Sequence, residues 1–168
     1  TTSGLSAHDQ MLDSPTFDGT DNGGNFATFN PLDDTENNGV GGCDFAEGNL
    51  QAGGAGDNVG IASTIATPSS GKYYAEFYLS ATPGNAYVGY YPSDESAIMS
   101  KVWVPSGNRT WNNSNLASYA QTGTLFKDGN TSTSSWGSTF TTGDIIQIAI
   151  DADNDAVYFG KNNTWQNS

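Results

Sequence analysis

The chain has 168 residues, a formal net charge of −13 and only 14% charged side chains. This length suits one domain, and the negative charge would repel nucleic acid and anionic membranes, so neither is expected as a partner. A single cysteine excludes an internal disulfide, a single histidine excludes a zinc site built on several histidines, and no apolar run is long enough for a membrane-spanning helix.

Residues 1–24 are polar and show no sustained periodicity, which predicts an extended leader or linker. Residues 25–168 are predicted to form the folded domain. Its first ordered segment is 25–33, where Asn30-Pro31 favours an extended or turn geometry. A short strand is predicted over 45–51, with a Gly-Asn turn or bulge, and another over 59–66.

The segment 72–80, KYYAEFYLS, predicts a strand because its residues alternate between two faces. One face carries Tyr73, Ala75, Phe77 and Leu79, and the other Tyr74, Glu76 and Tyr78. Both faces are largely apolar or aromatic, which predicts a central strand covered on two sides. Further strands are predicted over 86–91, 98–104 and 136–140, with short strands within 116–125 broken by Gly123 and a loop over 127–135.

The strongest hairpin signal is the segment 143–165, GDIIQIAIDADNDAVYFGKNNTW. Isoleucines alternate with Gln147 and Ala149, and a second apolar run begins at Ala156. Between them, residues 151–155 are Asp- and Asn-rich and suit a turn. These strands at short intervals, without helical spacing, predict an all-β antiparallel β-sandwich or jelly roll. A β-helix is the alternative, but no fixed internal period supports it.

Two segments together resemble SPRY domains. Residues 70–77, SGKYYAEF, are similar to the early-strand signature of that family. The later hairpin is similar in three runs, residues 143–146, 149–151 and 159–162, and Tyr87-Val88-Gly89-Tyr90 lies where the family has a Val-Gly strand. The resemblance covers about residues 45–165. It implies a concanavalin-like β-sandwich that binds protein partners. Residues 25–33 and the open Gly/Asn/Thr composition also resemble SPRY-like modules of bacteriophage tail-fibre and virion proteins.

The chain departs from the family pattern in two places. Ala75 stands where an aromatic residue is common, and the closing strand after the hairpin is expected to be absent. A missing last strand would leave a sheet edge open. The hypothesis is that a neighbouring chain or a continuation of this chain covers that edge.

Asp151, Asp153 and Asp155 place several oxygen ligands around one turn, a pattern that suits Ca²⁺. The pattern lacks the glycine and bidentate glutamate of a full calcium loop, so a plain hairpin turn is the alternative interpretation. No other cofactor is expected.

Candidate binding residues surround Trp111, which lies among amide side chains in residues 108–115, NRTWNNSN. An aromatic residue among amides in a loop suits a glycan or protein contact. The candidates are Asn108, Arg109, Trp111 and Asn112, together with the pair Tyr90 and Tyr91. Trp103, Trp111 and Trp136 could form an aromatic platform with that pair, although a core role is favoured for Trp103.

Catalysis is not expected. The chain has four glutamates, and none lies two residues from another acid on a predicted strand, as a glycosidase pair would require. Glu76 is expected to act as a structural hydrogen-bond acceptor.

The sequence therefore predicts a non-enzymatic structural or attachment module of a phage particle or fibre, on the virion surface or otherwise extracellular. Its partners would be other virion or fibre subunits in an oligomer, and a host surface protein or glycan. Binding is predicted at sandwich-end loops, residues 92–96, 106–115 and 127–135. A carbohydrate-binding module of a secreted bacterial protein is the first alternative, and a glycoside hydrolase or lyase domain the second.

Overall fold

The computed structural model describes residues 27–35, 44–53, 60–64, 67–81, 86–90, 117–127 and 131–167. Every regular element in this part is a β-strand, which confirms the all-β prediction. The described part has no helix that is long and apolar enough to cross a membrane. The strands are β1 (Phe29–Thr35), β2 (Asp44–Ala46), β3 (Gln51–Gly53), β4 (Gly60–Ser63), β5 (Lys72–Tyr78), β6 (Tyr87–Tyr90), β7 (Ala117–Ala120), β8 (Leu125–Lys127), β9 (Thr131–Thr133), β10 (Ile145–Asp151), β11 (Ala156–Lys161) and β12 (Thr164–Trp165).

Contacts divide the chain into two compact units, residues 1–66 with 95–109 and residues 67–94 with 110–168. The predicted leader, residues 1–24, lies outside the described residues, and the boundary at residue 25 stays a prediction. In the first unit β1 pairs with β4 and β2 with β3, both antiparallel. The segment 45–51, predicted as a short strand with a Gly-Asn turn or bulge, forms a hairpin between β2 and β3. Glu47, Gly48 and Asn49 all adopt the left-handed conformation there and reverse the chain.

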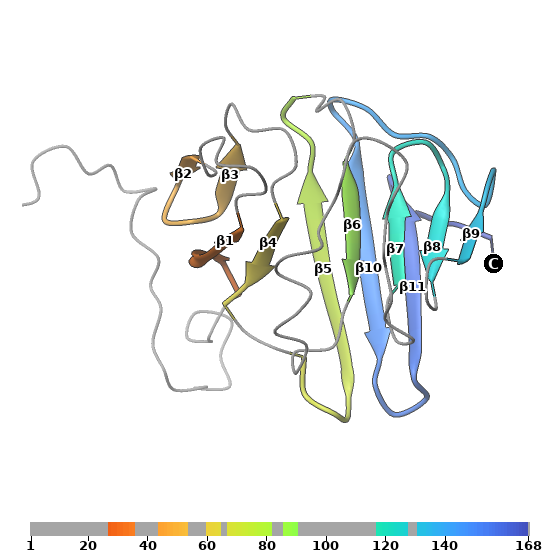
Figure 1. Ribbon diagram of the computed structural model, residues 1–168. Helices are drawn as coiled ribbons and strands as arrows, with labels where there is room; N and C mark the ends of the chain where they lie inside the picture. The colour runs from red at the N-terminus through yellow and green to blue at the C-terminus, as the bar shows by residue number, and fades with distance from the viewer. Residues whose placement is uncertain are drawn as a thin grey trace, which may run out of the picture. The chain divides into compact units, whose positions relative to one another are not determined.

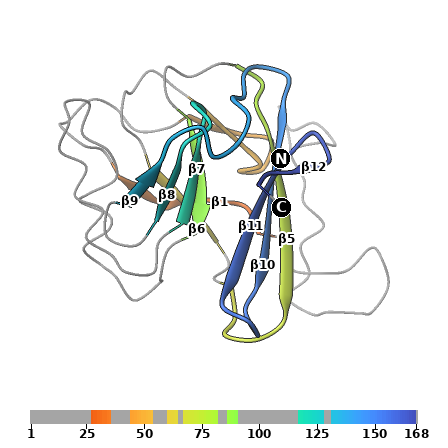
Figure 2. The ribbon, with the colours of Figure 1, turned by 90° about the vertical axis from the view of Figure 1, so that its right-hand side faces the viewer.

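The second unit is a β-sandwich of two four-stranded antiparallel sheets (Figure 2). One has the order β12-β11-β10-β5, and the other β6-β7-β8-β9. In Figure 1, β6 and β7 of the second sheet overlap the first sheet, and Figure 2 shows β5, β10 and β11 side by side. Strand β9 lies in the segment predicted as the loop 127–135, so that part of the loop prediction was wrong.

Aromatic and aliphatic side chains from both sheets form one core in this unit. The buried members are Tyr119, Phe140, Ile146, Ile148 and Phe159, from β7, the 136–144 segment, β10 and β11. Tyr119 lies 5.5 Å from Trp136 and 5.1 Å from Phe140 between ring centroids. Burial, with the nearby charge of Asp144, raises the pKa of Tyr119 to about 12. Its hydroxyl therefore stays a donor at neutral pH, and it donates to the Ser138 carbonyl.

The segment 136–140 was predicted as a strand and is irregular instead. Its backbone groups bond to separate partners rather than to a neighbouring ladder. The Ser138 N–H donates to the Gln166 side chain at 2.7 Å, and the Phe140 N–H donates to the Gln121 carbonyl at 3.1 Å. The segment's hydrogen bonds are thus satisfied without a strand.

The predicted hairpin is confirmed: β10 and β11 pair from Ile146↔Lys161 to Asp151↔Ala156, and residues 152–155 form the turn. Strand β5 pairs with the other edge of β10. Its predicted alternation is also confirmed, because Phe77 and Leu79 pack against the core while Tyr74 and Tyr78 are exposed. The prediction that β5 is central and covered on two sides was wrong: it ends the sheet order among the described strands, and its second face is open.

A two-residue strand, β12, follows the hairpin, and the expected absence of a longer closing strand stays a prediction. Strand β12 pairs with β11 through Gly160↔Trp165 and Lys161↔Thr164. Asn162 and Asn163 both have positive φ, 47° and 63°, and asparagine tolerates this left-handed conformation better than most residues. The chain can therefore reverse tightly and return along the β11 edge.

Candidate binding face on one sheet

The most distinctive exposed feature of the second unit is the side of the β12-β11-β10-β5 sheet that faces away from its core, here called the outer face. Its register places residues from different strands in rows. One row is Tyr74, Ala149 and Tyr158, the next is Glu76, Gln147, Gly160 and Trp165, and a third holds Tyr78 and Ile145.

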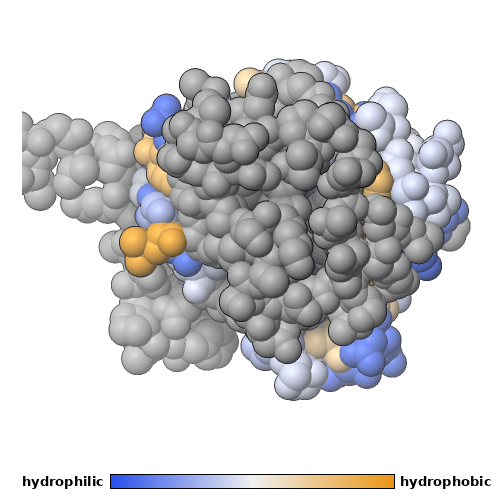
Figure 3. All heavy atoms as spheres, viewed as in Figure 1, coloured by the Kyte–Doolittle hydropathy of each residue, from blue (hydrophilic) through white to orange (hydrophobic). Residues whose placement is uncertain are grey.

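Four large aromatic residues of this face remain open to solvent. The exposed fractions are 55% for Tyr74, 66% for Tyr78, 54% for Tyr158 and 45% for Trp165. Aromatic side chains normally bury most of their surface, so four on one sheet face mark a candidate interaction surface. Where the view of Figure 3 shows described residues, those coloured as strongly hydrophobic form small separate patches.

Gln147 lies at the centre of the outer face and is only 5% exposed. Its Nε2 donates to the Tyr74 hydroxyl at 2.8 Å and to Asn163 Oδ1 at 3.0 Å, with a longer contact of 3.3 Å to Glu76 Oε1. Its Oε1 accepts from the Asn163 N–H at 2.9 Å. The buried amide is thus satisfied at both ends, which fixes the groups around it.

Glu76 is the acceptor that completes this network, in agreement with its predicted role as a structural hydrogen-bond acceptor. The Tyr74 hydroxyl donates to Glu76 Oε1. The hydrogen bond to this carboxylate raises the pKa of Tyr74 above its ordinary value, with desolvation as a further cause. Tyr74 is therefore held as a neutral phenol across the physiological pH range, and its ring position is fixed by its hydroxyl.

Gly160 is the point at which Trp165 and Gln147 cover the sheet. A β-carbon at Gly160 would lie 2.9 Å from Gln147 Oε1 and 3.2 Å from the Trp165 ring. Without that carbon, both side chains lie over the backbone. The Trp165 ring meets the Tyr74 ring edge-on, with centroids 6.4 Å apart and an interplanar angle of 74°. Such an edge-to-face arrangement is favourable for two aromatic rings.

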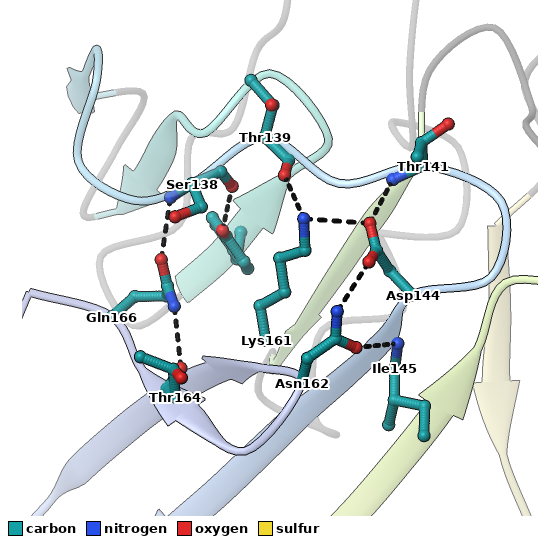
Figure 4. A network of polar contacts seen from close by, with 10 residues as sticks. Ser138, Thr139, Thr141, Asp144, Ile145, Lys161, Asn162, Thr164 and Gln166 are labelled. Atoms are coloured by element: carbon teal, nitrogen blue, oxygen red, sulfur yellow. Dashed lines mark hydrogen bonds and ion pairs between the residues drawn. The ribbon is translucent and has the colours of Figure 1, made fainter.

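A polar cluster at the end of the same sheet holds β12 and the irregular 136–144 segment together (Figure 4). Asp144 is its hub: its Oδ2 accepts from the Thr141 N–H at 2.7 Å and pairs with Lys161 Nζ at 3.0 Å, and its Oδ1 accepts from Asn162 Nδ2 at 2.7 Å. The Thr141 hydrogen bond, followed by those from Lys161 and Asn162, lowers the pKa of Asp144. We call Asp144, with its partners Thr141, Lys161 and Asn162, the edge cluster.

The hairpin-tip aspartates do not come together as a metal site. Asp151 forms an ion pair with Lys72 and accepts from Asn154 Nδ2 at 3.0 Å, and Asp153 Oδ1 accepts from the Gly71 N–H at 2.9 Å. Asp155 takes the left-handed turn position, with φ of 50°. Across the described ranges, no group of three His, Cys, Asp or Glu side chains could hold a metal ion. The Ca²⁺ prediction therefore has no support in this geometry, and the turn interpretation fits it.

The predicted aromatic binding residues are only partly within reach. The described residues do not include the predicted binding residues Asn108, Arg109, Trp111, Asn112 and Tyr91. They also do not include Trp103 or the loops 92–96 and 106–115. Tyr90 is half-buried and packs against the core of the second unit, so a platform role for it is not supported. Trp136 also packs in that core, 6.1 Å from Phe159 between ring centroids.

The sequence analysis missed the outer face, although part of its signal was visible. The alternation in β5 had already placed Tyr74, Glu76 and Tyr78 together. The contribution of Trp165 depends on the reversal at Asn162-Asn163, and that of Gln147 on the register between β5 and β10.

A glycosidase pair does not fit the outer face. Glu76 and Asp151 are the two carboxylates on it among the paired residues of these strands. Their rows are four residues apart, or about 13 Å along the strands. The two known arrangements need carboxylates about 5 Å or about 6.5–9.5 Å apart.

Comparison with known protein families finds no match. Comparison with curated proteins finds none either. Among solved structures, the SPRY domain of human HERC1 is similar, with 22% sequence identity and a TM-score of 0.41 over 62% of this chain. The matched region spans 61% of that domain's chain. The chain itself folds, in its second unit, as an antiparallel β-sandwich.

Proposed function

We propose that the chain is a non-enzymatic attachment module and that its binding surface is the outer face. One observation carries the proposal: four exposed aromatic residues share one sheet face with a buried, fully hydrogen-bonded amide. Protein interfaces are enriched in tyrosine and tryptophan, and side chains that are already fixed in place lower the entropy cost of binding. The resemblance of residues 70–77 and 143–162 to SPRY domains, a binding family, points the same way.

The proposed setting is a phage particle or fibre, on the virion surface or otherwise extracellular, with other virion or fibre subunits as partners. It rests on the acidic, Gly/Asn/Thr-rich composition and on the resemblance of residues 25–33 to phage modules. Sedimentation of the full chain tests it, because a fibre or shell component is expected to form closed oligomers. A carbohydrate-binding module of a secreted bacterial protein would use the same face and is the second candidate.

The binding proposal is tested on intact bacterial cells with the labelled full chain. We expect saturable binding to some strains of a panel, and loss of that binding in the double variant Tyr158→Ala, Trp165→Ala. Leu50→Ala is the matched control, because Leu50 is also 53% exposed but lies in the first unit. Equal binding by the double variant and the wild type would contradict the proposed surface.

A further inference from the structure

We propose that the outer face binds a neutral carbohydrate, with a sugar ring against Trp165 and Tyr74 and sugar hydroxyl groups on Glu76 and Asn163. This inference rests on the proposed binding function and names the ligand class for it. Sugars present apolar C–H surfaces together with a rim of hydroxyl groups. A matching site needs exposed rings with a few fixed polar groups beside them.

The rings of the site are already held in place. Tyr74 is anchored through its hydroxyl, which donates to Glu76 and accepts from Gln147. Trp165 lies over Gly160 and against the Tyr74 ring. Ala149, a small residue, lies between Tyr74 and Tyr158 in their row. A ligand can therefore approach the sheet between these two rings without displacing a large side chain.

The polar groups left over for a ligand are one acceptor and one donor. Glu76 uses Oε1 within the face, and its Oε2 has no partner in the described part of the chain. Asn163 uses its N–H and Oδ1 on Gln147, and its side-chain NH₂ has no partner among the same residues. A sugar hydroxyl is both donor and acceptor. Neighbouring hydroxyls can therefore donate to Glu76 and accept from Asn163.

Charge argues for a neutral ligand rather than an acidic one. Glu76 is the one charged residue in the three rows of the outer face defined above. The nearest cation on that face is Lys72, which is paired with Asp151. The whole chain carries a net charge of −13, so uronate, sialylated or sulfated glycans would be repelled. A basic peptide would gain less from Glu76, because Tyr74 and Gln147 already stabilise that carboxylate.

An array tests the ligand class with the labelled full chain. It carries neutral hexose oligosaccharides, acidic glycans and Lys/Arg-rich peptides. We expect binding to members of the neutral set, with affinity unchanged between about 0.05 and 0.5 M NaCl, since no ion pair forms. Binding restricted to acidic glycans or to basic peptides overturns the inference.

Variants test the assigned residues against the best neutral oligosaccharide of the array. Trp165→Ala is expected to weaken its affinity about 10-fold or more, and Leu50→Ala to leave it unchanged. Glu76→Gln keeps the shape of the side chain and one acceptor oxygen, so the affinity for the oligosaccharide is expected to fall by less than about 10-fold. The affinity for a cationic ligand would fall further. If Trp165→Ala lowers the folded fraction, Trp165→Phe replaces it, with a smaller loss expected. Wild-type affinity in the Trp165 variants overturns the inference.

The two proposals fail in different ways. If no glycan binds but the outer-face double variant still abolishes binding to cells, the carbohydrate inference is wrong and the attachment function stands. If cell binding is unaffected by the outer-face variants, the attachment proposal fails at this surface.

Discussion

The two faces of the β12-β11-β10-β5 sheet use the same kind of residue for different ends. On the inner face, Phe159 and Ile146 are almost fully buried and contribute to the core. On the outer face, Tyr74 and Trp165 are about half exposed and surround the Gln147 amide. The difference lies in the polar atoms: phenylalanine and isoleucine gain only from burial, whereas tyrosine offers a ring and a hydroxyl together.

The largest expected effect comes from breaking the inner face. Phe159→Ala removes a ring that is 1% exposed and contacts Tyr119 and Trp136. We expect a loss of about 3–5 kcal/mol in the free energy of unfolding, because a cavity remains where the ring was. Chemical denaturation monitored by circular dichroism measures it. A loss below about 1 kcal/mol would contradict the assigned core.

A smaller effect is expected where the outer face lies closest to the backbone. Gly160→Ala places a methyl group 2.9 Å from Gln147 Oε1 and 3.2 Å from Trp165. Overpacking of this kind costs about 1–3 kcal/mol, and it should also shift the Trp165 ring and weaken binding. Denaturation and cell binding are measured on the same sample. Gly53→Ala is the control, since no atom lies within 4 Å of the position of its β-carbon.

A pH titration separates the edge cluster from both faces. The pKa of Asp144 is lowered in the fold, so its stabilising contribution is present above the ordinary aspartate pKa of about 4. It is lost as pH falls through the lowered value, because the unfolded state then binds more protons. Thermal unfolding between about pH 7 and pH 3 should show a smaller loss of stability for Asp144→Asn than for the wild type. Parallel curves would contradict this account.

The smallest effect on stability is expected for Tyr158→Ala. Tyr158 is 54% exposed on the outer face, and substitutions at such positions change stability by about 0.5 kcal/mol or less. Its effect on binding should be much larger than its effect on unfolding. This contrast sharpens the comparison of the two faces. Phe159 is the next residue along β11, and its substitution should change the free energy of unfolding more than it changes binding.

Much of the fold could be predicted because its signals are local. The isoleucine alternation of β10, the Asp/Asn turn and the run from Ala156 determined the hairpin, and the alternation of β5 assigned its two faces correctly. The sequence led to the wrong prediction that Tyr74 and Tyr78 are covered, because tyrosine suits both buried and exposed positions. The irregular path of residues 136–140 depends on the Gln166 side chain, which is 28 positions away from Ser138.

The candidate site was less predictable because it depends on register. Gln147 meets Glu76 only through the pairing of β5 with β10, and Trp165 reaches the same row only because two asparagines reverse the chain. The sequence instead favoured Trp111, whose local surroundings are rich in amides but which lies outside the described residues. A site assembled across strands leaves no compact motif in the sequence.

The neighbouring positions of Trp165 and Gln166 have a consequence for communication within the second unit. Trp165 belongs to the outer face, while Gln166 Oε1 accepts from the Ser138 N–H and Gln166 Nε2 donates to the Thr164 carbonyl. A ligand that immobilises Trp165 therefore also restrains the next residue. Deuterium uptake at the Ser138 amide should slow when a ligand occupies the outer face. Exchange at a backbone amide remote from the ligand would then show that the ligand is bound.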